Sequence, residues 1–160
     1  MGLRVDTVQL HSGRKTRREI IEHGVVVAVV AIDSEDNVLL VRQYRKPVEK
    51  MLLEIPAGGV EPGEDPLHSA CRELEEETGF SAERWERLGG FYTSPGFCTE
   101  YIHLYVATEL RPGKRPADDD ENIEVEHIPL NKVFELIAAG EICDAKSIAG
   151  LLTVLQKAQT

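Results

Sequence analysis

Residues 56–80 combine a glycine- and proline-rich loop with a helix whose two ends are both marked by capping residues. Asp65 suits the N-cap, Pro66 suits the first helical position, and Gly79 suits the position just past the last turn. Four apolar residues follow the i, i+3, i+4, i+7 spacing of a core-facing stripe: Leu67, Ala70, Cys71 and Leu74. The segment therefore predicts a helix over residues 66–78 that packs against the core of a globular domain.

The rest of the chain predicts a mixture of strands and helices. Residues 25–32 are apolar and rich in β-branched side chains, which is typical of a strand covered on both faces. Further strands are predicted over residues 38–44, 51–55, 88–92, 101–109 and 123–129, and helices over residues 131–139, with Asn131 as N-cap, and 147–157. Because hairpin-linked strands combine with few helices, we expect an α+β fold, an α/β/α sandwich with a mixed β-sheet.

The N-terminal residues 1–21 predict a separate element. They alternate loosely between apolar and polar residues, contain a turn at residues 11–13, and carry a net charge of +3. This pattern indicates a marginal β-hairpin. We therefore expect a short hairpin over residues 1–21 and a single domain over residues 22–160.

The charge of the chain is unevenly distributed. Eighteen basic and 28 acidic residues give a formal charge of −10, which argues against sequence-independent nucleic-acid binding. Residues 54–80 carry a net charge of −7 and residues 116–126 a net charge of −6. If the fold brings these segments together, their carboxylates repel unless a divalent cation such as Mg²⁺ lies between them. Two solvated surface faces are the alternative interpretation.

Several features bear on where the protein acts. The longest apolar run has eight residues, whereas a membrane-spanning helix needs about 20, and the N-terminus lacks the pattern of a signal peptide. Cys71, Cys98 and Cys143 lie far apart without CxxC spacing, so neither a disulfide framework nor a zinc site is expected. These features favour a cytoplasmic protein without a membrane partner.

Three glutamates are spaced i, i+3, i+4 on the predicted helix, so Glu73, Glu76 and Glu77 share one face, which we expect to be exposed. Like charges near a helix C-terminus lower its stability, and Arg72 is the only basic residue nearby. A sequence that accepts such a local loss usually does so for function, here metal binding. A solvated glutamate-rich helix is the alternative.

Nine residues stand at fixed spacing over positions 58–80: Gly58, Glu64, Arg72, Glu73, Leu74, Glu76, Glu77, Gly79 and Phe80. At every fixed position this pattern resembles the signature GX5EX7REUXEEXGU of the Nudix hydrolases, in which U is aliphatic or apolar. The resemblance implies hydrolysis of a nucleoside diphosphate linked to another moiety, with Mg²⁺ or Mn²⁺ as cofactor. It implies that Glu73, Glu76 and Glu77 bind the metal, while Glu64 and Arg72 brace the loop against the helix.

Two further metal ligands are expected outside the helix. The resemblance implies that the carbonyl of Ala57 is one, and that an acid from a later loop acts as base or additional ligand. Residues 118–121 are four successive acids. We favour Glu121, because its side chain is the longest and it lies two residues before the next predicted strand, with Asp119 and Asp120 as alternatives.

Pro95 lies 16 positions after Gly79, and this spacing resembles the ADP-ribose pyrophosphatase subgroup. Residues 41–47 and 53–58 also resemble that subgroup, and the whole resemblance covers residues 25–155. We therefore place Pro95 among the substrate-binding residues, although residues 94–96 can also be an ordinary Pro-Gly turn.

Other residues resemble substrate-contacting positions of the same subgroup. Arg45 suits phosphate oxygens, whereas Glu54 and Glu100 can accept hydrogen bonds from ribose hydroxyls or from the adenine amino group. Each can instead be an ordinary surface residue. The candidates to stack on adenine are Tyr44, Phe97 and Tyr101, although such aromatic residues more often pack in a core.

The predicted function is hydrolysis of ADP-ribose to AMP and ribose 5-phosphate by attack of a metal-activated water. A Nudix hydrolase of a nucleotide sugar or an oxidised nucleotide is one alternative. A non-catalytic nucleotide-binding module is another, although it would not need a helix face of repelling glutamates. The subgroup commonly forms dimers through its N-terminal strands, so we expect a homodimer in which residues 1–21 take part.

Overall fold

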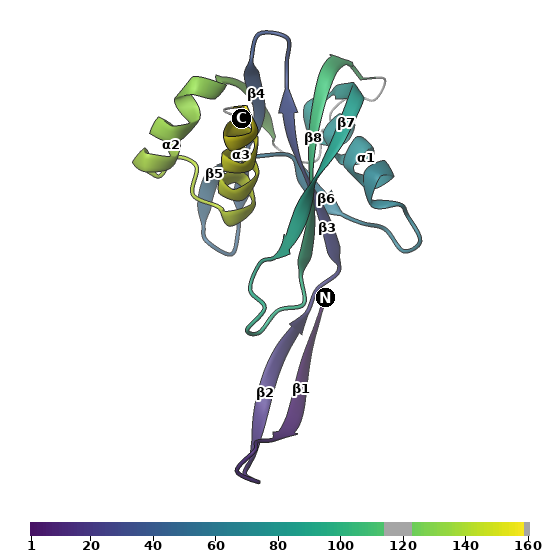
Figure 1. Cartoon of the computed structure of the whole chain (residues 1–160), viewed down its shortest axis with the longest axis vertical. Coiled ribbons are helices and arrows are strands. Elements are labelled where there is room, and N and C mark those ends of the chain that lie inside the picture. The colour runs from purple at the N-terminus through teal and green to yellow at the C-terminus, as the bar shows by residue number, and fades with distance from the viewer. Residues whose placement is uncertain (114–122, 159–160) are drawn as a thin grey trace.

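Within residues 1–113 and 123–158, which the computed structural model describes, the chain forms a seven-stranded mixed sheet between two helical layers (Figure 1). Helix α1 (Pro66–Thr78) lies on one side of the sheet. Helices α2 (Val133–Ala139) and α3 (Ala145–Lys157) lie on the other. This arrangement is the α/β/α sandwich predicted from the sequence.

Strand β3 is the central element of the sheet, whose order is β5-β4-β3-β8-β7, with β6 paired to β3 and β9 paired to β4. Strands β3 and β8 are parallel, and the other pairs are antiparallel. The strands of the sheet are β3 (Val25–Ile32), β4 (Asn37–Arg45), β5 (Lys50–Glu54), β6 (Ala57–Gly59), β7 (Phe80–Tyr92), β8 (Tyr101–Pro112) and β9 (Glu124–Pro129).

Strands β4 and β6 occupy successive stretches of one edge of β3. Val27 is opposite Gly58 of β6, whereas Ala31 is opposite Leu39 of β4. The pairing of β6 with the first half of β3 fixes residues 57–59 beside the start of that strand. This short strand is where the candidate site forms.

The core has two parts because side chains alternate across β3. Val29 packs with Leu74 of α1, whereas Ala28 and Val30 pack with Leu151 of α3. All five side chains are fully buried. The prediction of a strand covered on both faces over residues 25–32 is therefore confirmed.

Helix α1 has the predicted limits and the predicted caps. The Oδ1 atom of Asp65 accepts a hydrogen bond from the amide of Leu67 at 2.9 Å. Gly79 adopts a left-handed conformation with φ of 72°, which suits glycine at the end of a helix. Asp65 thus fixes the start of the helix at the loop before it, and Gly79 fixes the end of the helix.

Two strands differ most from the sequence-based expectation. Strand β7 begins at Phe80, eight residues before the predicted start, because an edge strand with one exposed face needs no continuous apolar run. Strand β6 lies in a segment predicted to be loop. Its glycines provide no side-chain pattern, and the strand exists through backbone pairing with β3.

The starts of two helices also differ from the prediction. Asn131 does not cap α2, so this prediction is wrong: residues Leu130–Lys132 form a 3-10 turn that begins after Pro129, and no side chain caps α2. Helix α3 begins at Ala145, two residues before the predicted start. Its N-cap is Asp144, whose Oδ1 atom accepts a hydrogen bond from the amide of Ser147 at 3.1 Å.

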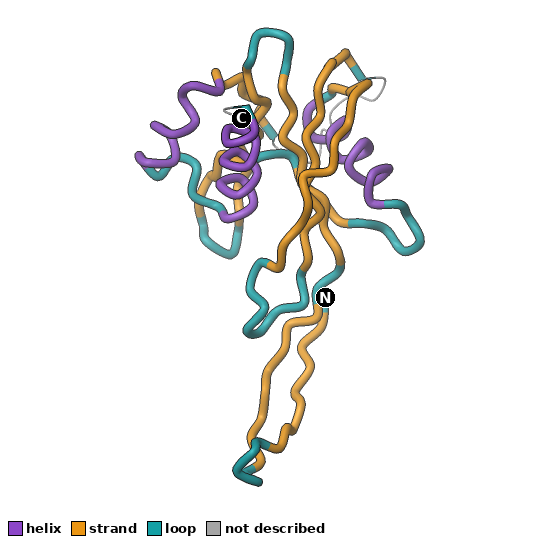
Figure 2. Tube along the Cα trace, viewed as in Figure 1, coloured by secondary structure: helices purple, strands orange, loops and turns teal. Residues whose placement is uncertain are grey.

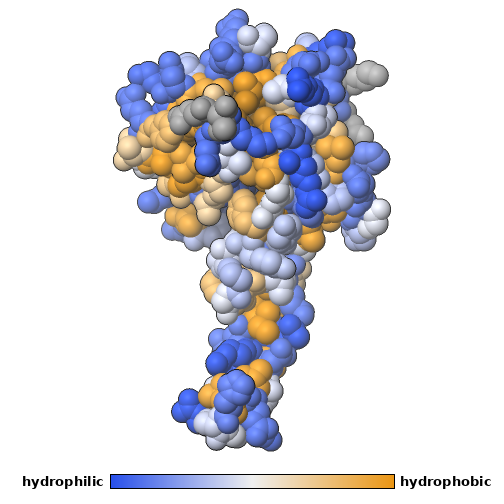
Figure 3. Space-filling view, viewed as in Figure 1, coloured by the Kyte–Doolittle hydropathy of each residue, from blue (hydrophilic) through white to orange (hydrophobic). Residues whose placement is uncertain are grey.

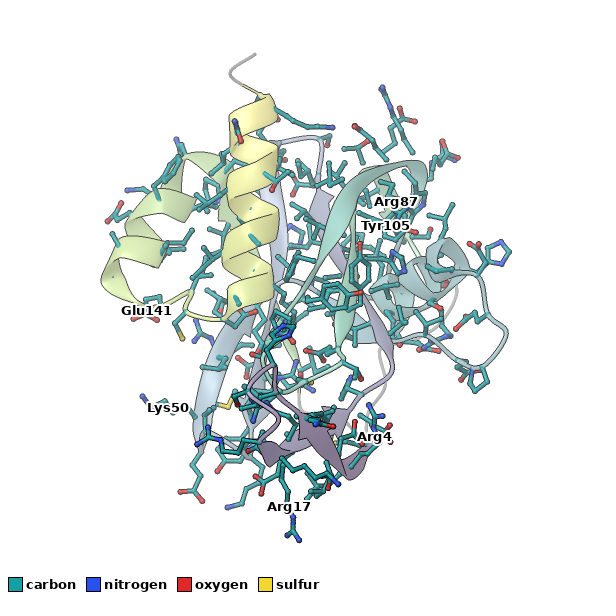
Figure 4. All side chains as sticks on the ribbon, turned by 60° about the horizontal axis from the view of Figure 1, so that its bottom comes forward. Arg4, Arg17, Lys50, Arg87, Tyr105 and Glu141 are labelled. Carbon is teal, nitrogen blue, oxygen red and sulfur yellow. The ribbon has the colours of Figure 1, made fainter. Side chains whose placement is uncertain are left out.

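The predicted hairpin is present as β1 (Gly2–Gln9) and β2 (Lys15–Glu22), and it projects from the body of the protein (Figure 3). Arg4 and Arg17 extend from it in Figure 4. It is connected to the loop between β7 and β8, beside its base in Figure 2, by backbone hydrogen bonds between Ile21 and residues 97 and 99 at 2.7 and 3.0 Å.

Among the described residues, no helix combines the length and the apolar character needed to cross a bilayer.

Candidate active site

The guanidinium of Arg72 contacts three of the predicted carboxylates. Its Nη1 atom donates to Oε1 of Glu73 at 2.7 Å and to Oε2 of Glu76 at 2.9 Å. Its Nε and Nη2 atoms donate to the two oxygens of Glu64 at 3.3 and 3.2 Å, and Nη2 also donates to the carbonyl of Gly59 at 3.0 Å. The structure thus brings Arg72 and Glu64 together between loop and helix, as predicted.

Glu64 is held by more than the arginine. The hydroxyl of Ser69, a buried residue that the sequence analysis did not single out, donates to Oε2 of Glu64 at 2.6 Å. Hydrogen bonds from Arg72 and Ser69 lower the pKa of Glu64 to about 2. The same contact with Glu64 raises the pKa of Arg72. Both partners are therefore charged at neutral pH.

Strand β6 covers the carboxylate face of α1. The amide of Ala57 donates to Oε2 of Glu77 at 3.0 Å, and a Cβ atom built on Gly58 would lie 1.9 Å from Cδ of Glu73. Glu77 is 7 % exposed. The expectation of an exposed face is therefore wrong, because the loop before the helix folds back over it as a strand.

A cleft of 590 Å³ adjoins the other side of β6, on the sheet face that carries α3. Its lining includes three predicted substrate-binding residues, Arg45, Glu54 and Glu100, together with the backbone of β6. The full set is His23, Val26, Arg45, Glu54, Ala57, Gly58, Gly59, Thr93, Glu100, Ile102, Asp144, Ala145 and Lys146. Strand β6 therefore separates the cleft from Glu73 and Glu77.

Arg45 and Glu54 form a bidentate ion pair in this cleft, with Nε to Oε1 at 3.0 Å and Nη2 to Oε2 at 2.8 Å. Glu54 is 2 % exposed. Lys146 also donates to Oε2 of Glu54, and to Oδ1 of Asp144 at 2.9 Å. Burial raises the pKa of Glu54, but hydrogen bonds from Arg45 and the charge of Lys146 outweigh it, so the pKa lies below its ordinary value.

The remaining predicted contacts divide into two groups. Glu100 lines the cleft and pairs with Nδ1 of His23 at 3.3 Å. Tyr44, Pro95 and Phe97 are exposed and do not line the cleft. Since side chains alternate along β4, Tyr44 points away from the sheet face that carries neighbouring Arg45.

A comparison with known proteins places this geometry in a family. The model of the NUDIX domain matches residues 22–151. The chain belongs to the Nudix family. Of the fixed positions of the Nudix signature, Glu64, Glu73 and Glu76 contact Arg72, and Glu77 contacts β6.

Several known proteins are similar to this chain over most of its length. It is 44 % identical over 147 residues to an ADP-ribose pyrophosphatase of Bacillus subtilis (strain 168), covering 91 % of this chain and 80 % of that protein. It is 47 % identical over 148 residues to a methanol dehydrogenase activator of Bacillus methanolicus, with the same coverage. The crystal structure of an ADP compounds hydrolase matches with a TM-score of 0.86 and 25 % identity, covering 98 % of this chain and 86 % of that chain.

Divalent-metal dependence is typical of Nudix hydrolases, and the donor chemistry of the site fits it. Glu73, Glu76 and Glu77 provide the carboxylate oxygens that hard divalent cations prefer, and Gly58 leaves room for the Glu73 carboxylate against β6. In this conformation a cationic group, Nη1 of Arg72, already bridges Glu73 and Glu76. No three acidic, histidine or cysteine side chains within the described residues converge as a metal site.

The loop acids lie elsewhere in the sequence. Glu121 and its alternatives Asp119 and Asp120 fall outside the described residues, so their role stays a prediction.

Three cleft residues were not predicted from the sequence: His23, Asp144 and Lys146. Of these, only Asp144 had a sequence signal, since an aspartate directly before a helix is a common N-cap.

Proposed function

We propose that the chain hydrolyses ADP-ribose to AMP and ribose 5-phosphate with Mg²⁺ or Mn²⁺ as cofactor. The observation that carries the proposal is the contact of Glu73 and Glu77 with β6, which lines the cleft on its other side. The similarity to a relative named ADP-ribose pyrophosphatase supports the substrate. The cofactor follows from the carboxylates that α1 presents there.

Different residues of the chain would have different roles in the reaction. Glu73, Glu76 and Glu77 would hold the metal with the carbonyl of Ala57, and Arg72 with Glu64 would keep these carboxylates in place. When bound, a divalent cation neutralises diphosphate oxygens and lowers the pKa of a water.

Other residues would act directly on the substrate. Arg45 would donate to phosphate oxygens, and Glu100 would accept from a ribose hydroxyl or the adenine amino group. Glu121 would take the proton of the attacking water as its oxygen bonds to phosphorus and the bridging P–O bond breaks. Tyr44, Pro95 and Phe97 lie outside the cleft of one chain, so any contact they make with substrate would involve a second copy.

A substrate panel tests this function. ADP-ribose, a nucleotide sugar and an oxidised nucleoside triphosphate would each be incubated with Mg²⁺ and with Mn²⁺, and the products identified by mass spectrometry. We expect AMP and ribose 5-phosphate from ADP-ribose at the highest kcat/KM. Preferred cleavage of another substrate would contradict the assignment, and nucleotide binding without any cleavage would favour the non-catalytic module.

We further propose a homodimer in which the hairpin takes part. Strand β1 pairs only with β2 among the described strands, and Leu3 and Val5 are 71 % and 51 % exposed. A two-stranded hairpin is barely stable alone, so burial of these side chains against a second copy would stabilise it. Light scattering at micromolar concentration should give a dimer. A monomer whose activity survives deletion of residues 1–18 would contradict the proposal.

A cytoplasmic location stays a prediction from the sequence.

A further inference from the structure

Four side chains of alternating charge form a chain of ion pairs along the α3 side of the cleft. They run from Arg45 through Glu54 and Lys146 to Asp144. Glu54 and Lys146 are 92 positions apart in the sequence, and their contact joins the end of β5 to the first turn of α3. The two cations meet at one atom, because Nη2 of Arg45 and Nζ of Lys146 both donate to Oε2 of Glu54.

One cation would be enough to neutralise Glu54. A buried carboxylate requires a counter-charge, and a bidentate arginine supplies it together with two hydrogen bonds. Lys146 therefore adds a second positive charge to a carboxylate that already has one. Asp144 balances this added charge, so the four side chains together are neutral.

The position of Lys146 is not explained by the stability of α3. Lys146 is the second residue of the helix, where the helix dipole disfavours a positive charge. The helix also has its own N-cap in Asp144. The side chain of Lys146 is instead 14 % exposed and turned toward Glu54, at the wall of the cleft. The contact with Glu54 is thus the reason for a lysine here.

The two cations differ in their freedom to move. The side chain of Arg45 is 37 % exposed, whereas that of Lys146 is 14 % exposed and is held by two carboxylates. Arg45 is thus the partner that can turn toward a ligand in the cleft. If it were the only counter-charge of Glu54, turning away would leave a buried charge unpaired, at a high cost in free energy.

We propose that Lys146 is a positioning residue that keeps Glu54 neutralised while Arg45 turns its donors to the phosphates of a nucleoside diphosphate. The inference rests on the proposed function in that Arg45 meets a diphosphate in the cleft. Lys146 itself does not touch the substrate. Its removal therefore weakens binding only while Glu54 carries a charge.

The test is a double-mutant cycle on the affinity for ADP, measured by calorimetry with Mg²⁺ present. We expect Lys146→Met to raise Kd about tenfold, equivalent to about 1.4 kcal/mol, and Lys146→Arg to restore most of the affinity. In a Glu54→Gln background, Lys146→Met should have no further effect on Kd, because position 54 then carries no charge for Lys146 to neutralise. The same loss in both backgrounds would overturn the inference, since Lys146 would then contact the phosphate directly.

Two controls complete the experiment. Lys157→Met removes a lysine from the other end of α3 that pairs with Glu86, and should leave Kd unchanged. Arg45→Met should weaken ADP binding. If either Arg45→Met or Lys146→Met has the same Kd as the unaltered chain, the inference is overturned. Lys146→Met should fold, since Arg45 still pairs with Glu54. Turnover of ADP-ribose by the unaltered chain tests the proposed function separately, so either can fail alone.

Discussion

Gly58 of β6 and Glu73 of α1 approach so closely that a side chain at position 58 would occupy the space of the carboxylate. A Cβ atom built on Gly58 would lie 1.9 Å from Cδ and 2.1 Å from Oε2 of Glu73. The two residues belong to different elements, a strand and a helix that are separated by the loop of residues 60–65. Gly58, a fixed position of the signature, thus leaves space for the Glu73 carboxylate beside β6.

Gly58→Ala should therefore lower kcat by about 10²-fold, because displacement of a positioned group by about 1 Å has effects of that size. The overpacked contact should also reduce the free energy of unfolding by about 1–3 kcal/mol. Steady-state kinetics and urea denaturation measure the two effects. Gly59→Ala is the matched control for stability, since a Cβ there has nothing within 4 Å. Equal stability of the two variants would contradict the steric argument.

Glu73→Gln and Glu77→Gln should each lower kcat by at least about 10–100-fold, which is the usual effect of altering even the residues that support metal ligands. The losses should not add in the double variant, since both carboxylates serve one cluster. Thermal stability should stay level, because glutamine can still accept the hydrogen bond from Ala57 that Glu77 accepts at 3.0 Å. Glu75→Gln, on the same helix outside the fixed positions, is the control. Full activity of Glu77→Gln would contradict the metal-site assignment.

Substitution of the loop acid should slow the chemical step without weakening substrate binding. If Glu121 accepts the proton of the attacking water, Glu121→Gln should lower kcat by about 10²–10⁴-fold with little change in KM. Asp119→Asn and Asp120→Asn test the neighbouring positions in the same assay. A collapse of turnover in one of these, with Glu121→Gln active, would move the role by one or two residues. Activity in all three variants would leave proton transfer to the helix carboxylates and weaken the substrate assignment.

Local signals explain which parts of the fold could be predicted. The caps at Asp65 and Gly79 and the apolar stripe of α1 are encoded within a few residues, and the helix has the predicted limits. The same holds for the all-apolar strand of residues 25–32. Strand β6 could not be predicted, because its partner β3 lies about 30 residues away in the sequence and its glycines have no side-chain pattern.

The candidate site likewise has a part that the sequence predicts and a part that depends on tertiary contacts. The i, i+3, i+4 spacing placed Glu73, Glu76 and Glu77 on one face, but the burial of that face depends on β6 folding back over α1. The contact of Lys146 with Glu54 depends on how α3 packs against the end of β5. There the Oγ atom of Ser147 also accepts a hydrogen bond from the buried amide of Ile55 at 2.9 Å. Such tertiary contacts have no local sequence signal.

The depressed pKa of Glu64 predicts how stability depends on pH. This pKa is about 2 in the folded chain, against an ordinary value of 4.5, because Arg72 and Ser69 donate to the carboxylate. The unfolded chain therefore takes up this proton at a higher pH than the folded chain does. The resulting stabilisation is complete above about pH 4.5 and is lost as the pH falls toward 2.

Glu64→Gln should accordingly lower the free energy of unfolding at neutral pH and reduce its decline between pH 4.5 and 2. Part of the decline should persist in this variant. Burial raises the pKa of Asp33, but hydrogen bonds from His127 and Asn37 more than offset this and lower it to about 2. Asp33→Asn combined with Glu64→Gln should therefore flatten the profile further. Urea denaturation at a series of pH values measures these slopes, and a Glu64→Gln profile parallel to that of the unaltered chain would show that the Arg72 contact does not stabilise the folded state.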